Sequence, residues 1–222
     1  MIISPTTLLL TFILFTGVLL IGCNQENPVS VEESIERIPS LVQISGGQNA
    51  TLSARSNRSV SYFTFEVGNI SENPHISGGN FEGWCAVYNA PIKTDGTQYT
   101  GVKLYSTTSD RNKWQKVNYL LNNSEYHTGL DNVTYKEIQV AIWALLDFPA
   151  FDLNNLSAQN LPSSFINNGE PAFDVALVKA IVSYSVEKGS DFTLGLNNRY
   201  AVYAETENGV QNVIIVVEPN NN

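Results

Sequence analysis

One cysteine, Cys85, lies in the aromatic and apolar stretch FEGWCAVYNAP (81–91), which has the composition of a β-strand. The chain has one other cysteine, Cys23, which we expect to be modified for reasons given below, so Cys85 is left without a disulfide partner. Three roles remain open for its thiol. It could be an inert buried side chain, a catalytic thiolate, or one end of a covalent bond to a group other than sulfur.

A second candidate is Gln139, within the predicted helix YKEIQVAIWALLD (135–147). At 3.6 residues per turn it shares one face with Tyr135, Trp143 and Leu146, so a primary amide lies in an aromatic and aliphatic stripe. The opposite face is also apolar, and we expect the helix to be packed on both sides. A buried amide without partners costs about 1–3 kcal/mol. Gln139 is therefore either a core residue hydrogen-bonded to backbone or a group used in chemistry.

Strands are expected on both sides of these residues in the chain. VSYFTFEV (60–67) is rich in strand formers, and the strand around Cys85 is expected to run from Trp84 to Tyr88 and to end before Pro91. On such a strand, Cys85 faces away from Trp84 and Tyr88. Two further strands, 199–204 and 211–217, are joined through Asn208-Gly209, which is a strong hairpin signal.

Three helices are expected between the strands, over 109–123, 134–147 and 171–189. Ser109 is placed as the N-cap of the first, and Thr134 with Glu137 forms a capping box on the second, which Pro149 ends. Pro171 is expected at the first position of the third, which stops at Gly189. Helices flanked by strands indicate an α+β fold, a β-rich sandwich or barrel with an inserted helical subdomain.

The N-terminus carries an apolar run from Leu8 to Leu20, which is short for a membrane span and suits a secretory signal. It ends in Leu20-Ile21-Gly22-Cys23, which resembles a lipobox, the bacterial signal cleaved before a cysteine that receives acyl chains. The alternative is an uncleaved anchor helix. We expect a signal peptide over 1–22, a lipid-anchored polar tether over 23–47 and a folded domain over 48–222.

Charge excludes some partners. The chain has 12 Lys and Arg against 21 Asp and Glu, a net charge of −9, and an acidic surface repels phosphate, so we expect no nucleic-acid binding. No basic amphipathic stretch is present, so membrane contact is expected through the lipid alone. The expected location is the bacterial cell envelope, anchored to membrane and exposed at the surface.

Three segments carry a resemblance to a known family: GWC on a strand, VNYLLNN in the first helix, and IQVAIW opening the capped helix. Together they resemble bacterial thioester domains, surface adhesin modules in which a Cys and a Gln side chain form an internal thioester. The family's second signature is a Gln after Thr or a hydrophobic residue and followed, after two residues, by two hydrophobics. Residues Ile138 to Trp143 match it, and the resemblance spans about 60–217.

The resemblance implies that the Cys85 sulfur attacks the side-chain carbonyl of Gln139 with loss of ammonia, which leaves an acyl–sulfur bond. Such a bond lasts where water is excluded, and the expected walls of the site are Trp84, Tyr88, Ile142 and Trp143. An amine on a target, typically a lysine of a surface protein or polymer, would open the bond and become linked to Gln139. The expected protein is a lipid-anchored adhesin that reacts once rather than a turnover enzyme, and it needs no cofactor or metal.

Two alternatives belong to other functional classes. A cysteine hydrolase would use Cys85 with His75 or His127 as base, but a nucleophilic cysteine usually lies at a helix N-terminus, and both histidines fall in polar loops. A noncovalent, lipid-anchored β-rich binding module would use exposed aromatic side chains and leave Cys85 inert. The sequence leaves this second alternative open.

Overall fold

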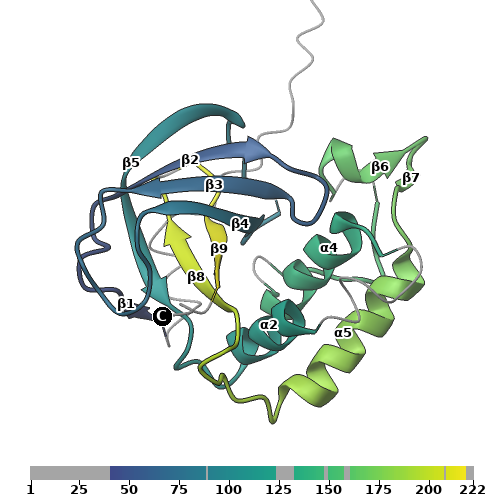
Figure 1. The fold of residues 1–222 in the computed structure, drawn as a ribbon. Helices are drawn as coiled ribbons and strands as arrows, with labels where there is room; N and C mark the ends of the chain where they lie inside the picture. The colour runs from purple at the N-terminus through teal and green to yellow at the C-terminus, as the bar shows by residue number, and fades with distance from the viewer. Residues whose placement is uncertain are drawn as a thin grey trace, which may run out of the picture.

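The computed structural model describes residues 41–88, 90–123, 133–147, 150–157, 161–207 and 209–218. Six antiparallel strands follow one another in the order β5-β2-β3-β4-β9-β8, and β8 pairs back to β5, which closes a barrel (Figure 1). Their bounds are β2 Ala50–Ser56, β3 Phe63–Gly68, β4 Gly79–Cys85, β5 Asp95–Ser106, β8 Tyr200–Glu205 and β9 Val213–Val217. The barrel and the helices inserted between β5 and β8 confirm the predicted α+β fold.

In strands whose outer face meets solvent, successive side chains alternate between the barrel interior and the exposed outer surface. In β3, Phe63, Phe65 and Val67 are buried, whereas Glu66 is exposed, as the two-residue period of a strand requires. β8 is buried on both faces along most of its length, because α2 (Lys113–Asn122) packs against its outer side. The predicted hairpin at the C-terminal end is confirmed by the pairing of β8 with β9.

A short strand, β1 (Val42–Gln43), extends the sheet along β5, where Val42 lies opposite Ser106. Ile44, which follows it, is 2% exposed and donates its backbone N–H to the carbonyl of Leu104. These residues fall within the range 23–47 that the sequence predicts to be a tether. The folded part of the chain therefore includes Val42, which pairs with β5, and Ile44, whose side chain packs in the hydrophobic core.

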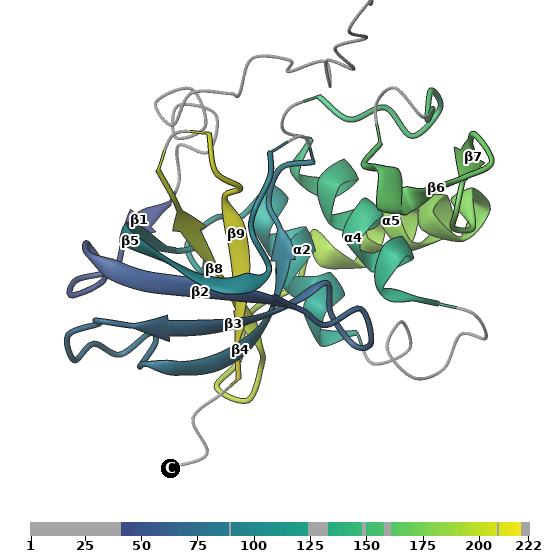
Figure 2. The same ribbon diagram turned by 90° about the horizontal axis from the view of Figure 1, so that it is seen from above.

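Three helices form a subdomain on one side of the barrel, as the two perpendicular views show (Figure 1; Figure 2). They are α2, α4 (Tyr135–Leu146) and α5 (Val175–Gly189), and α5 packs on the other two. A 3-10 helix, η1 (Ser163–Phe165), and a small hairpin of β6 (Ile166–Asn167) and β7 (Glu170–Pro171) precede α5. The packing of α5 on α2 is close, since a Cβ at Gly189 would lie 3.0 Å from the Cα of Lys116.

Two predicted helix starts are wrong, and local hydrogen bonds explain both. Ser109 does not cap α2, because the side chain of Asp110 accepts from the N–H groups of Asn112 and Trp114 and turns the chain before the helix begins at Lys113. Pro171 does not open α5, because it belongs to β7. The N-cap of α5 is Asp174, whose carboxylate accepts from the N–H of Leu177.

The start of α4 is as predicted. The carboxylate of Glu137 accepts from the backbone N–H of Thr134, and the Thr134 side chain accepts from the backbone N–H of Glu137, so both halves of the capping box are present; the Thr134 hydroxyl also accepts from the N–H of Lys136. Glu137 also accepts from the N–H of Asp174 at 3.0 Å, so one buried carboxylate joins the N-termini of α4 and α5. The helix ends at Leu146, after which Asp147 adopts a left-handed conformation. Pro149, expected to end it, lies outside the described residues.

Side-chain amides dock α2 onto the barrel. The Asn122 amide donates to the carbonyl of Arg199 at 2.7 Å and accepts from its N–H at 2.8 Å. One turn earlier, Asn118 accepts from the N–H of Ala201 and donates to Thr107, all within the interior. Each amide thus accepts from a backbone N–H at or just before the start of β8, which fixes the helix against the sheet.

Candidate functional site

Cys85 is the last residue of β4, and the chain bends immediately after it. The prediction of a strand through Tyr88 is therefore wrong, and the reason lies in the neighbouring strands. The side chain of Gln211 donates to the carbonyl of Val87 at 2.7 Å, and the backbone N–H of Gln211 donates to Pro91. These contacts, from the residues before β9, hold the segment after Cys85 in a bent path.

The pairing of β4 with its two neighbours decides where the backbone groups of Cys85 point. Ala86 donates its N–H to Asn212 on the β9 side, so by the alternation of an antiparallel ladder the N–H and C=O of Cys85 point to the β3 side. On that side Phe63 lies opposite Gly83, and continuing the register would bring Ser61 opposite Cys85. β3 begins only at Phe63, so the ladder position beside Cys85 has no strand residue.

The side-chain amide of Gln139 occupies that ladder position. The backbone N–H of Cys85 donates to Gln139 Oε1 at 2.8 Å, and Gln139 Nε2 donates to the carbonyl of Cys85 at 3.0 Å. Gln139 comes from the middle of α4, which contacts β4 here. The structure therefore brings together the two residues that the sequence singled out, and the side-chain amide of Gln139 is held against the backbone of the residue that carries the thiol.

Both residues are removed from solvent. Gln139 is 0% exposed and Cys85 is 6% exposed, and the thiol of Cys85 is free of any disulfide. Burial in apolar surroundings raises the pKa of the Cys85 thiol well above its ordinary value of 9.0. The thiol is therefore held in its neutral form, the opposite of the lowered pKa that a catalytic thiolate needs.

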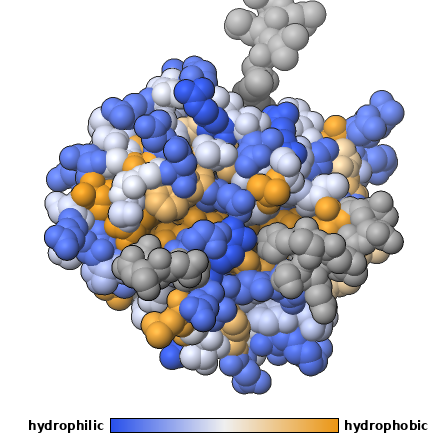
Figure 3. All heavy atoms as spheres, in the orientation of Figure 1, coloured by the Kyte–Doolittle hydropathy of each residue, from blue (hydrophilic) through white to orange (hydrophobic). Residues whose placement is uncertain are grey.

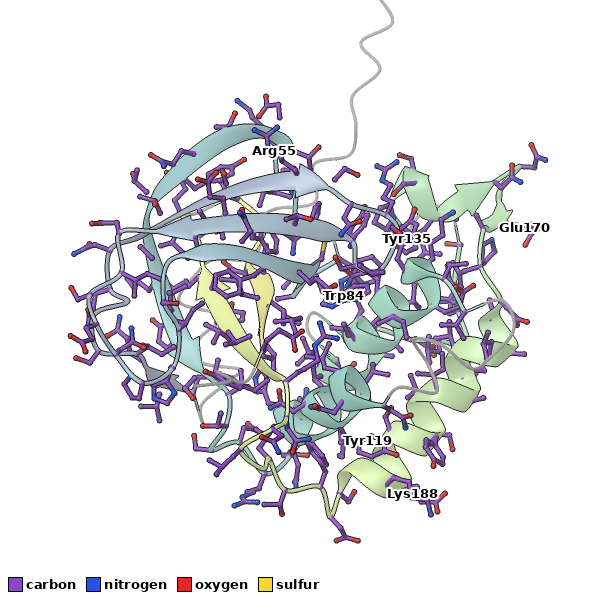
Figure 4. The ribbon with its side chains drawn as sticks, in the orientation of Figure 1. Arg55, Trp84, Tyr119, Tyr135, Glu170 and Lys188 are labelled. Carbon is purple, nitrogen blue, oxygen red and sulfur yellow. The ribbon has the colours of Figure 1, made fainter. Side chains whose placement is uncertain are left out.

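The four residues expected to wall the site are buried or half-buried. Trp84, Ile142 and Trp143 are buried, whereas Tyr88 is half-buried and packs edge-on against Trp143, with ring centroids 6.1 Å apart. Figure 4 shows Trp84 on β4 facing α4, with Tyr135 at the start of that helix. Figure 3 shows apolar residues gathered across the middle of this face, over the strands and towards the helices.

One aromatic residue near the site was missed by the sequence analysis. Tyr62, just before β3, stacks on Tyr135 with ring centroids 5.6 Å apart and an interplanar angle of 11°. Its hydroxyl lies 3.3 Å from the hydroxyl of Ser164 on η1. The strand formers in 60–67 predict a strand that includes Tyr62, but they could not pair it with Ser164, 102 positions away.

The histidines do not meet the thiol in the described part of the chain. His75 lies in the connection from β3 to β4, at the end of β4 opposite to Cys85, and a seven-residue strand spans about 20 Å. Its backbone carbonyl accepts from the Tyr200 hydroxyl, and its N–H donates to Asn73. His127 lies outside the described residues, as do Cys23 and the predicted signal peptide.

No group of three or more His, Cys, Asp or Glu side chains within the described ranges is placed to hold a metal ion. No helix within the same ranges has the length and apolar character to cross a membrane.

Comparisons with known proteins give one structural match and no sequence match. No protein-family model matches the chain, and no curated protein sequence matches it. Among solved structures, the N-terminal domain of the Streptococcus pyogenes pilus tip adhesin Cpa is similar, with a TM-score of 0.45 and 12% sequence identity. The match covers 78% of this chain and 94% of that chain.

Proposed function

We propose that Cys85 and Gln139 form an internal thioester and that the protein uses it to capture amines covalently. The observation that carries the proposal is the pair of hydrogen bonds between the Gln139 amide and the backbone of Cys85, at 2.8 and 3.0 Å. They hold the amide carbon beside the residue that bears the only thiol among the described residues. The short motifs GWC and IQVAIW, which resemble those of thioester domains, agree with this pairing.

The bond-forming step follows from the groups in place. Sγ of Cys85 attacks Cδ of Gln139, the C–N bond breaks, and the thiol proton leaves with Nε2 as ammonia, so no oxidant or further reactant is needed. Negative charge develops on Oε1 during the attack. The backbone N–H of Cys85 already donates to that oxygen and would stabilise the charge, as an oxyanion-hole donor does.

Capture of a target replaces the carbon–sulfur bond of the thioester by a carbon–nitrogen bond. A neutral amine attacks the same carbon, the C–S bond breaks, and the amine proton passes to sulfur, which restores the Cys85 thiol and leaves an amide on Gln139. The raised pKa of the Cys85 thiol favours the neutral thiol that this step releases. The apolar walls exclude the water that would otherwise hydrolyse the bond. The protein is thus a single-turnover covalent binder.

The cellular setting belongs to the same proposal. Residues 1–22 serve as a signal peptide, Cys23 carries the lipid, and a polar tether runs from Cys23 to the barrel, which carries the thioester over the range 48–222. The protein acts as an adhesin at the surface of the bacterial envelope. Its target is an amine-bearing surface protein or polymer, with lysine as the reacting group.

Mass spectrometry of the full-length protein tests the thioester. We expect a mass lower by one ammonia than the sequence requires, and an acidic digest that yields the peptides of Cys85 and Gln139 joined. Methylamine should add its mass at Gln139 and expose one alkylatable thiol at Cys85. Gln139→Ala should leave the thiol free from the start, and Cys85→Ala should restore the full mass.

Asn122→Ala is the matched control, because its amide holds the backbone of Arg199 by the same two-bond pattern with no thiol on that residue. It should lose some stability and leave the mass deficit unchanged. A wild-type protein at full mass, without a methylamine adduct, would make the noncovalent binding module with an inert Cys85 the better interpretation. Loss of capture in a His75→Ala, His127→Ala double variant that still folds would favour the hydrolase instead.

Lipid attachment has its own test. Cys23→Ala should abolish labelling by a fatty-acid analogue and release the protein from membranes, with the methylamine reaction at Gln139 unchanged. Labelling that persists in this variant, or a mature protein that keeps residues 1–22, would contradict the lipoprotein part of the proposal.

A further inference from the structure

Tyr62 connects the barrel to the helical subdomain next to the buried pair. It is half-buried, its ring stacks on Tyr135 and meets Phe165 edge-on at 5.6 Å and 83°, and its hydroxyl lies 3.3 Å from that of Ser164. The barrel thus supplies one tyrosine, and α4 and η1 supply its partners. These contacts cross the boundary at which Trp84 and Tyr135 are seen in Figure 4.

Two independent relationships place Tyr62 beside the strand end that carries Cys85 and the helix face that carries Gln139. The register of β3 with β4 pairs Phe63 with Gly83, and continuing it by one residue brings Tyr62 level with Trp84, the residue before Cys85, on the face of the sheet that Trp84 shares. On the other side, Tyr135 lies one helical turn before Gln139 and therefore on the same face of α4. Tyr62, stacked on Tyr135, is held between the two elements that carry the reacting groups.

Electrostatics agree with this position. Burial is the largest cause of the raised pKa of Tyr62, and the Cys85 side chain raises it further, so the phenol and the thiol lie close enough to interact.

The backbone beneath Tyr62 is fixed, whereas its side chain is held weakly. Asn57 donates its side-chain amide to the hydroxyls of Ser61 and Thr64, and its N–H donates to the carbonyl of Tyr62. Across the boundary, the hydroxyl contact with Ser164 is long for a bond between hydroxyls. A rotation of the Tyr62 side chain would break that bond and the stacking without disturbing the loop.

We propose that Tyr62 is a gate that decides which nucleophiles reach the Cys85–Gln139 bond, with Ser164 as its latch. This inference rests on the proposed thioester. Closed, the ring covers the bond on the half-exposed side of the site and keeps water from it. Open, it admits a slender, unbranched amine such as the end of a lysine side chain, and it disfavours amines branched next to nitrogen.

The strength of the Tyr62–Ser164 contact should therefore set the rates of aminolysis and hydrolysis of the thioester. Because attack requires the open form, weakening the latch raises the open population and with it every rate that depends on access. Loss of one net hydrogen bond corresponds to about a two- to tenfold larger open population. Both aminolysis and hydrolysis should rise by that factor, since both nucleophiles enter by the same route.

The experiment compares full-length wild type with Tyr62→Phe, Ser164→Ala and Tyr62→Ala. Only the fraction of each sample whose mass shows the loss of ammonia is followed. The probes are methylamine, N-acetyl-lysine amide and tert-butylamine, with buffer alone for hydrolysis. Tyr62→Phe and Ser164→Ala should each raise capture and hydrolysis about two- to tenfold. Tyr62→Ala should raise them further and reduce the preference for methylamine over tert-butylamine.

Tyr119→Phe is the matched control, because it removes the hydroxyl of another half-buried tyrosine, which lies on α2 away from the site and accepts from the Asn123 amide that follows this helix. It should leave every rate unchanged. Rates that stay within twofold of wild type, or fall, in Tyr62→Phe and Ser164→Ala while the mass deficit persists would overturn the gate alone. A wild-type protein at full mass would overturn the thioester and the gate together, so the two failures are distinguishable.

Discussion

The side chain of Gln139 replaces a strand as the partner of Cys85, since it both accepts from the N–H and donates to the C=O of that residue. β3 starts two residues too late to do this, and α4 supplies the amide in its place. The arrangement has a structural role whether or not a thioester forms. It keeps two buried backbone groups of Cys85 satisfied at the point where the ladder ends.

This role predicts a loss of stability that is independent of any crosslink. In a Cys85→Ala background, where no thioester can form, adding Gln139→Ala should lower the free energy of unfolding by about 2–5 kcal/mol, because two buried backbone groups lose their partners. Denaturant unfolding of the single and double variants measures the difference. A loss below about 0.5 kcal/mol would contradict the contact, since ordinary surface substitutions reach that size.

The parts of the site that depend on local sequence could be predicted, and those that depend on pairing could not. The capping box of Thr134 and Glu137 is set within four residues, and the structure has it as expected. Gln139 stood out because an amide in an apolar stripe has to be explained. The end of β4 at Cys85 was missed, because it depends on where β3 begins and on the hold of Gln211 on the chain after Cys85.

Dependence on distant parts of the chain also explains why the contacts of α2 and of Tyr62 could not be predicted. Asn122 reads as a helix stop, and it does end α2, but its amide also pairs with Arg199, 77 residues later in the chain. Tyr62 meets Ser164, 102 residues later. Nothing in the spacing of either residue signals its partner, because each contact forms only when the helical subdomain packs on the barrel.

The buried thiol predicts a pH dependence of stability. Above pH of about 9, the thiol of the unfolded chain loses its proton, whereas the folded state, whose thiol pKa is raised, keeps it. Unfolding then releases a proton, so stability present below that pH is lost as the pH rises. The free energy of unfolding of Gln139→Ala, relative to the Cys85→Ala, Gln139→Ala double variant, should fall by up to about 1.4 kcal/mol per pH unit.

The same measurement on wild type distinguishes the two states of Cys85. A thioester has no proton to lose, so wild type relative to Cys85→Ala should show no such slope between pH 9 and the onset of tyrosine ionisation, near pH 10. A slope equal to that of the Gln139→Ala comparison would mean that wild type carries a free thiol.

Gly83, two residues before Cys85, should not tolerate a side chain. A Cβ there would lie 2.2 Å from Phe65 Cε2 and 2.5 Å from the carbonyl oxygen of Ile214. Gly83→Ala should therefore push β4 away from its neighbours and destabilise the fold by about 1–3 kcal/mol or more. Thermal or denaturant unfolding measures this. Gly78→Ala is the control, because a Cβ there meets ordinary contact distances, the nearest at 3.4 Å.

Glu137 should be essential to the joint between α4 and α5. Its carboxylate is 3% exposed and accepts from the backbone N–H groups of Thr134 and Asp174, at the positive ends of two helix dipoles. Glu137→Ala leaves both donors buried without this acceptor and should cost about 2–5 kcal/mol of stability. Glu137→Gln keeps one carbonyl acceptor but turns an amide N–H towards the other donor, so its free energy of unfolding should fall between those of Glu137→Ala and wild type.

Glu66→Ala, which removes an exposed carboxylate on β3, is the control and should stay within about 0.5 kcal/mol of wild type. If Glu137→Ala unfolds at the same denaturant concentration as Glu66→Ala, the carboxylate does not hold the two helices together.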